Sequence, residues 1–300
     1  MGQEKKLPPL RFLPQRVERP WGSVEYDVAD LGFIDSVASG GWLGGNTLSE
    51  LMETYLDRIV GDRAFDYFGT QFPVMVKTLD VKGRTSLHVN PDDETAAQRY
   101  DAFGKTALWH VLEAGKDARL YLGFKRDVSA EEFYRSCMDG TVEDLLHVIR
   151  PKAGENYLIR PGEVHAAQGV KLLEIAESSE LWFRLHDWGS LEREIHLEEA
   201  FDLIELKAWK PMEKTPLFTV NQWQLDAPAS VEGGPEDSFR LYSCTGGAAA
   251  LKDGEGNRFP FKAGETLLVP AEMDAFSLEP CAEGTVLLET LYKTDGFSKD

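Results

Sequence analysis

Short apolar or alternating runs, each about the length of one strand, recur along most of this chain and are separated by glycine, proline and aspartate. Before Pro211 they occupy Val74–Val81, Ser86–Val89, Ala107–Leu112, Ala118–Phe124, Tyr157–Ile159, Leu172–Ala176 and Leu181–Leu185. After it they occupy Leu217–Leu225, Phe239–Ser243, Ala248–Leu251, Thr266–Val269 and Thr285–Tyr292. Strands at such spacing, without regular alternation with helices, favour an antiparallel sandwich or barrel over a doubly wound sheet. The sequence therefore predicts a mainly β fold.

Helical signals are few and local. Thr47 opens a capping box with Glu50, and the apolar face that follows ends at Gly61, which predicts one helix between them. Asn90 stands before Pro91 and two aspartates, an order typical of a helix cap followed by the first helical residues. The sequence thus predicts a second helix that begins at Asn90.

A small helical insert is predicted at residues 129–150, with one helix opened by Ser129 and another opened by Thr141. Taken with the strand pattern, this predicts a division of the chain into three parts. Residues 1–128 and 151–200 form a first β module around the insert, and residues 201–300 form a second.

One internal repeat supports two related modules. Lys152–Glu155 (Lys-Ala-Gly-Glu) recurs as Lys262–Glu265, and each copy leads through a short apolar strand to a proline. Four residues after that proline stands His165 in the first copy and Asp274 in the second. We therefore expect the first module to carry the functional site and the second to be mainly structural.

The charge balance excludes some partners. The chain has 51 acidic and 32 basic residues and a net charge of −19, which repels nucleic acid and anionic membranes. It has neither an apolar run long enough for a membrane helix nor the apolar segment of a signal peptide. Three widely spaced cysteines fit reduced thiols. We expect a cytoplasmic protein.

The six histidines include two that suit a metal site. His165 follows a Pro-Gly turn and enters a strand, as an imidazole in the mouth of a β-barrel would. His88 and Asn90 are two apart on one strand and so face the same side. These three residues can offer a metal two imidazole nitrogens and an amide oxygen, although helix capping is the competing role for Asn90. The others are expected to be surface or packing residues: His110, His147, His186 and His196.

Four charged residues suit a polar pocket. Lys77, Glu174 and Arg184 each lie in an apolar run, where a charge needs a partner. Lys105 follows Gly104, where the second predicted helix gives way to a strand. Within an acidic protein, local cations are what a phosphorylated ligand would require. The alternatives are a solvated surface for the lysines and a structural pair for Arg184 and Glu174.

Several segments, taken in chain order, resemble type I phosphomannose isomerases, a cupin family with two jelly-roll modules and a helical insert. The resemblance lies in Arg19–Gly22, Gly45–Leu51, Gln71–Lys77, Ser86–Asp93, Gly104–Trp109, Ile159–Ala166, Leu173–Ser179 and Phe183–Gly189. It is strong over roughly residues 10–200 and looser in the second module. It implies an enzyme that interconverts mannose 6-phosphate and fructose 6-phosphate through a cis-enediol, with zinc as cofactor.

The resemblance also implies four zinc ligands, and three of these positions are substituted. His88 stands where the family has glutamine, Asn90 where it has histidine, and Ala107 where it has glutamate. Only His165 matches the family. Because the one anionic ligand is lost, we expect weaker zinc binding, and Glu174 is the nearest candidate for a replacement carboxylate.

The rest of the family's pocket is retained. Lys77, Lys105, Glu174 and Arg184 occupy its polar positions. By resemblance, Arg184 stabilises the enediolate or assists proton transfer, and Lys105 lies beside the sugar phosphate. The expected catalytic residues are Arg184, Lys105 and Glu174, and the expected substrate-binding residues are Lys77, Lys105 and Arg184. Three functions follow: an isomerase with altered metal ligation, a non-catalytic sugar or sugar-phosphate binder with a regulatory role, or a purely structural protein.

Overall fold

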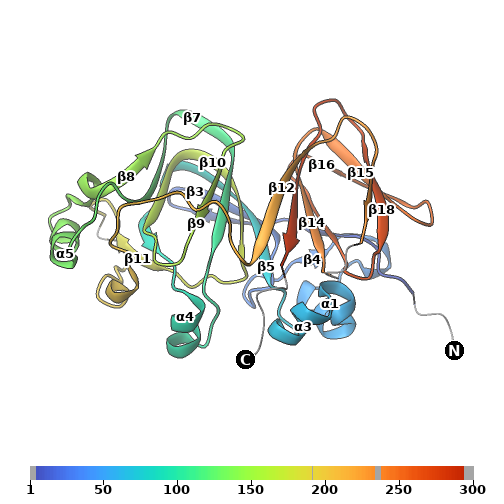
Figure 1. The fold of residues 1–300 in the computed structure, drawn as a ribbon, viewed down its shortest axis with the longest axis horizontal. Helices are drawn as coiled ribbons and strands as arrows, with labels where there is room; N and C mark the ends of the chain where they lie inside the picture. The colour runs from blue at the N-terminus through green and yellow to red at the C-terminus, as the bar shows by residue number, and fades with distance from the viewer. Residues whose placement is uncertain (1–4, 191, 234–237, 294–300) are drawn as a thin grey trace. The chain divides into compact units, whose positions relative to one another are not determined.

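The computed structural model describes residues 5–190, 192–233 and 238–293, which form two compact units. One unit comprises Arg16–Tyr26 and Val74–Glu213, and we call it the central unit. The other, the terminal unit, comprises Met1–Gln15, Asp27–Pro73 and Lys214–Asp300. Antiparallel sheets dominate both units (Figure 1), so the predicted mainly β fold is confirmed.

A sheet of nine strands makes up most of the central unit. Its order is β11-β6-β10-β5-β3-β2, and β7 pairs with β8, β9 and β10. Its strands are β2 (Gln15–Arg19), β3 (Gly22–Val28), β5 (Val74–Arg84), β6 (Leu87–Val89), β7 (Ala107–Phe124), β8 (Leu146–Ile149), β9 (Asn156–Ile159), β10 (His165–Glu177) and β11 (Phe183–His186). The two runs predicted at 107–112 and 118–124 are thus one long strand, β7.

The terminal unit contains a six-stranded sheet, β12-β19-β14-β17-β1-β4, and a four-stranded sheet, β13-β18-β15-β16. Its strands are β1 (Leu10–Leu13), β4 (Val37–Ala38), β12 (Phe218–Gln224), β13 (Ala229–Glu232), β14 (Arg240–Gly246), β15 (Ala248–Asp253), β16 (Arg258–Lys262), β17 (Thr266–Val269), β18 (Ala275–Pro280) and β19 (Val286–Tyr292). Tyr242, Leu267 and Leu278 belong to one apolar cluster that draws on both sheets. Apolar side chains thus fill the space between these sheets.

The internal repeat forms the same turn twice. In each copy the glutamate side chain accepts a hydrogen bond from the lysine backbone N–H, over 2.8 Å at Lys152 and 2.9 Å at Lys262. The glycine of each copy has a φ of 88°, in the left-handed region. The strands that follow, β9 and β17, begin at equivalent positions. The four-residue match therefore marks the same local structure in both copies.

The compact units cut the chain differently from the predicted modules, because residues 27–73 belong with the C-terminal part of the chain. The predicted division into 1–128 with 151–200, the insert 129–150, and 201–300 thus stays a prediction about domains. Within the terminal unit, Leu10 and Arg11 of β1 pair with β17, and Phe12 and Leu13 pair with β4, which accounts for part of the difference.

The first predicted helix is present but broken. Thr47 and Glu50 form the expected capping box at the start of α1 (Leu48–Tyr55). Leu56, with a φ of 51°, ends α1, and the short helices α2 (Asp57–Val60) and α3 (Asp62–Phe68) follow on either side of Gly61. The prediction of one continuous helix was wrong because the left-handed Leu56 interrupts the hydrogen-bond ladder.

The prediction of Asn90 as a helix cap was also wrong. The cap of α4 (Asp93–Tyr100) is Asp92, whose carboxylate accepts the backbone N–H of Thr95 over 2.7 Å. Asn90 and Asp92 flank Pro91 and are both good cap residues, and Asp92, which is nearer the helix, caps it. The amide of buried Asn90 instead donates to the backbone oxygen of Lys105 over 3.5 Å.

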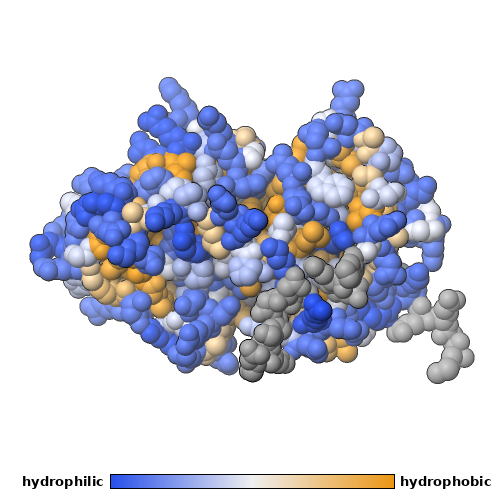
Figure 2. Space-filling model, viewed as in Figure 1, coloured by the Kyte–Doolittle hydropathy of each residue, from blue (hydrophilic) through white to orange (hydrophobic). Residues whose placement is uncertain are grey.

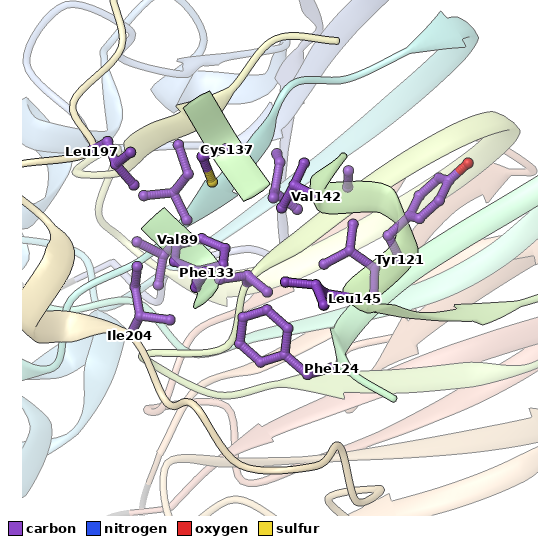
Figure 3. Close-up of a cluster of buried hydrophobic side chains, with 14 of the residues drawn as sticks. Val89, Tyr121, Phe124, Phe133, Cys137, Val142, Leu145, Leu197 and Ile204 are labelled. Carbon is purple, nitrogen blue, oxygen red and sulfur yellow. The ribbon is translucent and has the colours of Figure 1, made fainter. Parts of the chain in front are cut away.

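The insert contains one α-helix rather than two. Ser129 caps α5 (Ala130–Met138) as predicted, but Thr141 is followed by the short 3₁₀ helix η2 (Val142–Leu145). The next residues form β8, which pairs with β7, so His147 lies in a strand. Figure 3 shows Phe133 and Cys137 packed with Phe124, Val142 and Leu145, which anchors the insert to the sheet.

Two further 3₁₀ helices, η1 (Gly41–Leu43) and η3 (Phe201–Leu203), complete the described elements. Within the described ranges, no helix is long and apolar enough to cross a membrane. Hydrophilic residues cover most of the face shown in Figure 2, with smaller apolar areas between them.

A bulge in β10 decides which residues face the interior of the central unit. His165 and Glu174 are nine positions apart, so a regular strand would place them on opposite faces. The register with β5 and β7 shifts between Gln168 and Val170, at Gly169, whose φ is 60°. This shift lets both side chains line one cavity.

Candidate active site

The central unit encloses a cavity of about 300 Å³ between β5, β6, β7, β10 and β11. Every site residue predicted from the sequence lines it: Lys77, His88, Asn90, Lys105, His165, Glu174 and Arg184. They come from five separate segments of the chain, so the fold brings together residues that are far apart in the sequence.

Glu174 is the centre of a buried charge cluster. In the sheet it stands opposite Lys77 of β5 on one side and Trp109 of β7 on the other. Its Oε1 lies 3.2 Å from Nζ of Lys77 and 3.1 Å from Nζ of Lys105, and its Oε2 accepts the indole N–H of Trp109 over 2.7 Å. Glu180, which sequence reasoning missed, pairs with Lys77 and lies 3.8 Å from Lys105.

Mutual attraction keeps this cluster charged. Burial alone would raise the pKa of Glu174, but the two lysines and the Trp109 hydrogen bond hold it far below its usual value. The pKa of Lys105 is lowered by burial, against the attraction of Glu174. The pKa of Lys77 is raised because Glu174 and Glu180 together outweigh its burial. Glu174 is therefore a permanent counter-ion and a poor proton acceptor.

The segment before β7 that carries Lys105 is fixed by two acidic side chains. Asp93 accepts the backbone N–H of Gly104 over 2.9 Å, and Glu177 accepts that of Thr106 over 2.7 Å. Lys105 lies between these two bonds, and its own backbone N–H donates to Pro91. Asp93 and Glu177 thus position the ammonium group without lining the cavity.

We expect Glu177→Gln to remove one source of pH-dependent stability. Burial, with the nearby Asp93, raises the pKa of Glu177 to about 7 from 4.5. A raised carboxyl pKa means that the native state holds the proton more tightly, so the stabilisation is complete below pH 4.5 and is lost as pH rises through 7. The stability advantage of the wild type over the variant should shrink by more than about 1 kcal/mol across that range, at about 1.4 kcal/mol per pKa unit.

Urea unfolding of both proteins in the same series of buffers measures this difference, since other titrating groups contribute equally to both. A difference that stays constant with pH would show that folding does not shift the pKa of Glu177.

His88 and His165 form the second feature of the cavity. They are register partners on β6 and β10, their ring centres are 4.1 Å apart, and Arg184 of β11 is the next residue across the sheet. Nδ1 of His88 bonds to the carbonyl of Ser86 over 2.9 Å, and Nδ1 of His165 bonds to that of Glu163 over 2.7 Å. Burial lowers the pKa of His88 to about 4 and that of His165 well below its usual value, so both rings are neutral.

These donors do not complete a zinc site of the family's kind. Structural and catalytic zinc ions have three or four protein ligands, and two imidazoles on one tetrahedral zinc have ring centres about 5 Å apart. His88 and His165 are closer and pack edge to face. Glu174, the expected replacement carboxylate, is committed to two lysines. Among the described residues, no group of three histidine, cysteine, aspartate or glutamate side chains is arranged for a metal.

Arginines also line the cavity. Arg184 donates from Nε to Ser86 over 3.3 Å and from a terminal nitrogen to the carbonyl of Glu194 over 2.7 Å. Arg19 and Arg193 join it in the lining. Five cationic and two anionic side chains line the cavity, so a chain of net charge −19 concentrates positive charge here.

Several lining residues escaped the sequence reasoning. Besides Glu180, these are Arg19, Tyr26, Trp109, Trp182 and Arg193. The sequence could have indicated Trp109, because it lies two residues after Ala107, a family ligand position, and therefore faces the same side of the strand. The remaining histidines lie outside the lining, as expected: His110 bonds to Asn156, His147 stacks on Trp209, and His196 accepts the backbone N–H of Arg184.

Antiparallel β modules, one of which encloses a polar cavity, define a protein of the cupin class. Residues 210–287 match the family model described as the cupin domain of mannose-6-phosphate isomerase. The chain is 28% identical to mannose-6-phosphate isomerase ManA of Bacillus subtilis, over 92% of this chain and 97% of that protein.

Solved structures share the fold. A mannose 6-phosphate isomerase from Bacillus subtilis superposes with a TM-score of 0.81 at 23% identity, over 94% of this chain and 99% of that one. A mannose 6-phosphate isomerase bound with zinc and yttrium superposes with a TM-score of 0.74 at 14% identity, over 95% and 99%. The solved structures show the same fold. Together with them, the family-model match and the sequence match support membership of the type I phosphomannose isomerase cupin family, and the resemblance seen in the sequence is confirmed.

Proposed function

We propose that this protein is a mannose-6-phosphate isomerase that interconverts mannose 6-phosphate and fructose 6-phosphate through a cis-enediol. The observation that carries the proposal is the excess of cationic side chains around an enclosed cavity in a strongly acidic chain. Like-charge repulsion from the rest of the protein would disfavour a phosphorylated ligand, and only local cations offset it. The relative named as a mannose-6-phosphate isomerase supports the same reaction.

The charge cluster supplies what the reaction needs electrostatically. Moving a proton between C1 and C2 places negative charge on an enediolate oxygen, and a fixed cation in a dry site stabilises that charge. The ammonium groups of Lys77 and Lys105 are nearly buried and are held in place by Glu174. Because Glu174 remains ionised and paired, its role is to position these groups rather than to transfer the proton.

Arginine and lysine have different tasks in this arrangement. Guanidinium groups bind phosphate through paired hydrogen bonds, and three of them line one cavity. We assign the phosphate to Arg184 and its neighbours and the reacting carbons to the lysines. This assignment puts Lys105 at the reacting end of the sugar, whereas the family resemblance put it beside the phosphate.

Replacement of Arg184 by glutamine tests the proposal. Loss of a charge-assisted contact should lower kcat/KM for mannose 6-phosphate by about 10-fold to 100-fold, since a hydrogen bond to a charged group contributes about 1.5–3 kcal/mol. Arg135→Gln is the matched control, because Arg135 lies on the exposed face of α5. An Arg184→Gln variant with unchanged kcat/KM would contradict the assignment.

A second function, a non-catalytic sugar-phosphate binder, is favoured by the incomplete metal donor set. It predicts saturable binding of mannose 6-phosphate by folded protein with no formation of fructose 6-phosphate, whatever metal is supplied. Turnover by the wild type excludes it.

A further inference from the structure

The two cavity histidines have a fixed tautomer. A backbone carbonyl can only accept a hydrogen bond, so the Nδ1 atoms of His88 and His165 that contact carbonyls must both carry the proton. Each neutral ring then has its lone pair on Nε2. The same local arrangement, an imidazole bonded to the carbonyl two residues earlier, occurs on both strands.

Both Nε2 atoms are available to a ligand. Within the described part of the chain, no side chain or backbone group forms a hydrogen bond with either of them, and both histidines line the cavity. Because the ring centres are 4.1 Å apart, the two hydrogen-bond acceptors belong to neighbouring rings in the lining of one cavity. The ligand that matches them carries two neighbouring hydrogen-bond donors.

The surroundings restrict which donors fit. Trp182 packs against His88 at 5.6 Å and Trp109 against His165 at 5.5 Å, measured between ring centres, so each imidazole has an indole ring beside it. A phosphate offers mainly acceptor oxygens and is repelled by lone pairs. A sugar offers adjacent hydroxyl donors together with C–H groups that pack on aromatic rings.

We propose that His88 and His165 form a diol subsite, in which the two Nε2 atoms accept hydrogen bonds from adjacent hydroxyl groups of the sugar without an intervening metal ion. The subsite rests on the proposed function for the identity of its ligand. It fixes the ligand's direction, with the hydroxyl groups at the histidines and the phosphate at the arginines. His165, at the position of a family zinc ligand, and His88, at the position of a family glutamine, are in this chain direct contacts to the sugar.

Calorimetric titration in the presence of a chelator tests the subsite. Mannitol 6-phosphate is the probe, because it carries the hydroxyl groups and the phosphate but cannot be isomerised. Inorganic phosphate is the comparison ligand, because it lacks the diol. We expect the wild type to bind the polyol phosphate about 4-fold to 100-fold more tightly than phosphate, because two hydrogen bonds contribute about 2-fold to 10-fold each.

The variant His165→Phe should lose most of that preference and keep its affinity for inorganic phosphate. His147→Phe is the matched control, because His147 stacks on Trp209 away from the cavity lining. If His165→Phe does not fold, nitrogen NMR of the wild type tests the subsite instead. Polyol phosphate should shift the Nε2 resonances of two neutral imidazoles in chelator, and inorganic phosphate should not.

The outcomes separate the two proposals. Binding of the polyol phosphate only after zinc is added would overturn the diol subsite and leave the isomerase proposal intact. A His165→Phe variant with undiminished preference for the polyol would also overturn it. Failure of mannose 6-phosphate and mannitol 6-phosphate to bind, with or without zinc, would overturn the proposed function and the subsite together.

Discussion

Replacing Glu174 with glutamine is expected to lower the free energy of unfolding by about 3–5 kcal/mol, as for other buried ion pairs that lose one partner. The change keeps the shape of the side chain and its bond to Trp109 but removes the charge that faces both lysines. Glu180 is then the only carboxylate of the cluster that remains near two buried ammonium groups. Urea unfolding at neutral pH measures the loss.

The matched control is Glu131→Gln. Glu131 pairs with Arg135 over 2.6 Å on α5, but both side chains are mostly exposed, so the expected change is below about 0.5 kcal/mol. Adding Lys105→Met to Glu174→Gln should recover part of the stability, because it removes one uncompensated charge. A loss below about 1 kcal/mol in Glu174→Gln would show that the cavity is wet enough to solvate the lysines.

Restoring the family's ligands is expected to raise the zinc content from near zero to about one ion per chain, the stoichiometry of a single site. The triple variant is His88→Gln, Asn90→His and Ala107→Glu. Ala107 lies two residues before Trp109 on β7, so a glutamate there faces the same side as a residue that lines the cavity. Metal analysis after dialysis measures the change.

Adding His165→Ala to the triple variant provides the control, since this removes the one ligand that the chain already shares with the family. Zinc should then be lost again. If the triple variant gains no zinc, the geometry around the cavity has diverged as well as the ligands. If the wild type already retains one zinc through dialysis, the diol subsite is wrong.

The strand pattern of the chain could be predicted from sequence because local signals and tertiary pairing agree there. Apolar runs such as 74–81 and 266–269 became strands, and Thr47 formed its capping box as expected. The apolar runs around Lys77, Glu174 and Arg184 indicated that these charges need partners. The family resemblance then correctly placed them, with Lys105, in one cavity.

The features that could not be predicted depend on competition between neighbouring residues for one role, or on contacts between residues far apart in the sequence. Asn90 and Asp92 are both good helix caps, and only the position of α4 decides between them. Glu174 and His165 share a face because of the bulge at Gly169, which strand periodicity cannot show. Glu174 was the nearest candidate for a replacement zinc ligand, and its two lysine partners became visible only once β5, β7 and β10 were paired.

Conversion of mannose 6-phosphate to fructose 6-phosphate by the purified full-length protein, assayed in chelator and again with added zinc, tests the central claim most directly. The account predicts conversion in both conditions, with loss of kcat/KM in Arg184→Gln. Folded wild-type protein that forms no fructose 6-phosphate in either condition would contradict it.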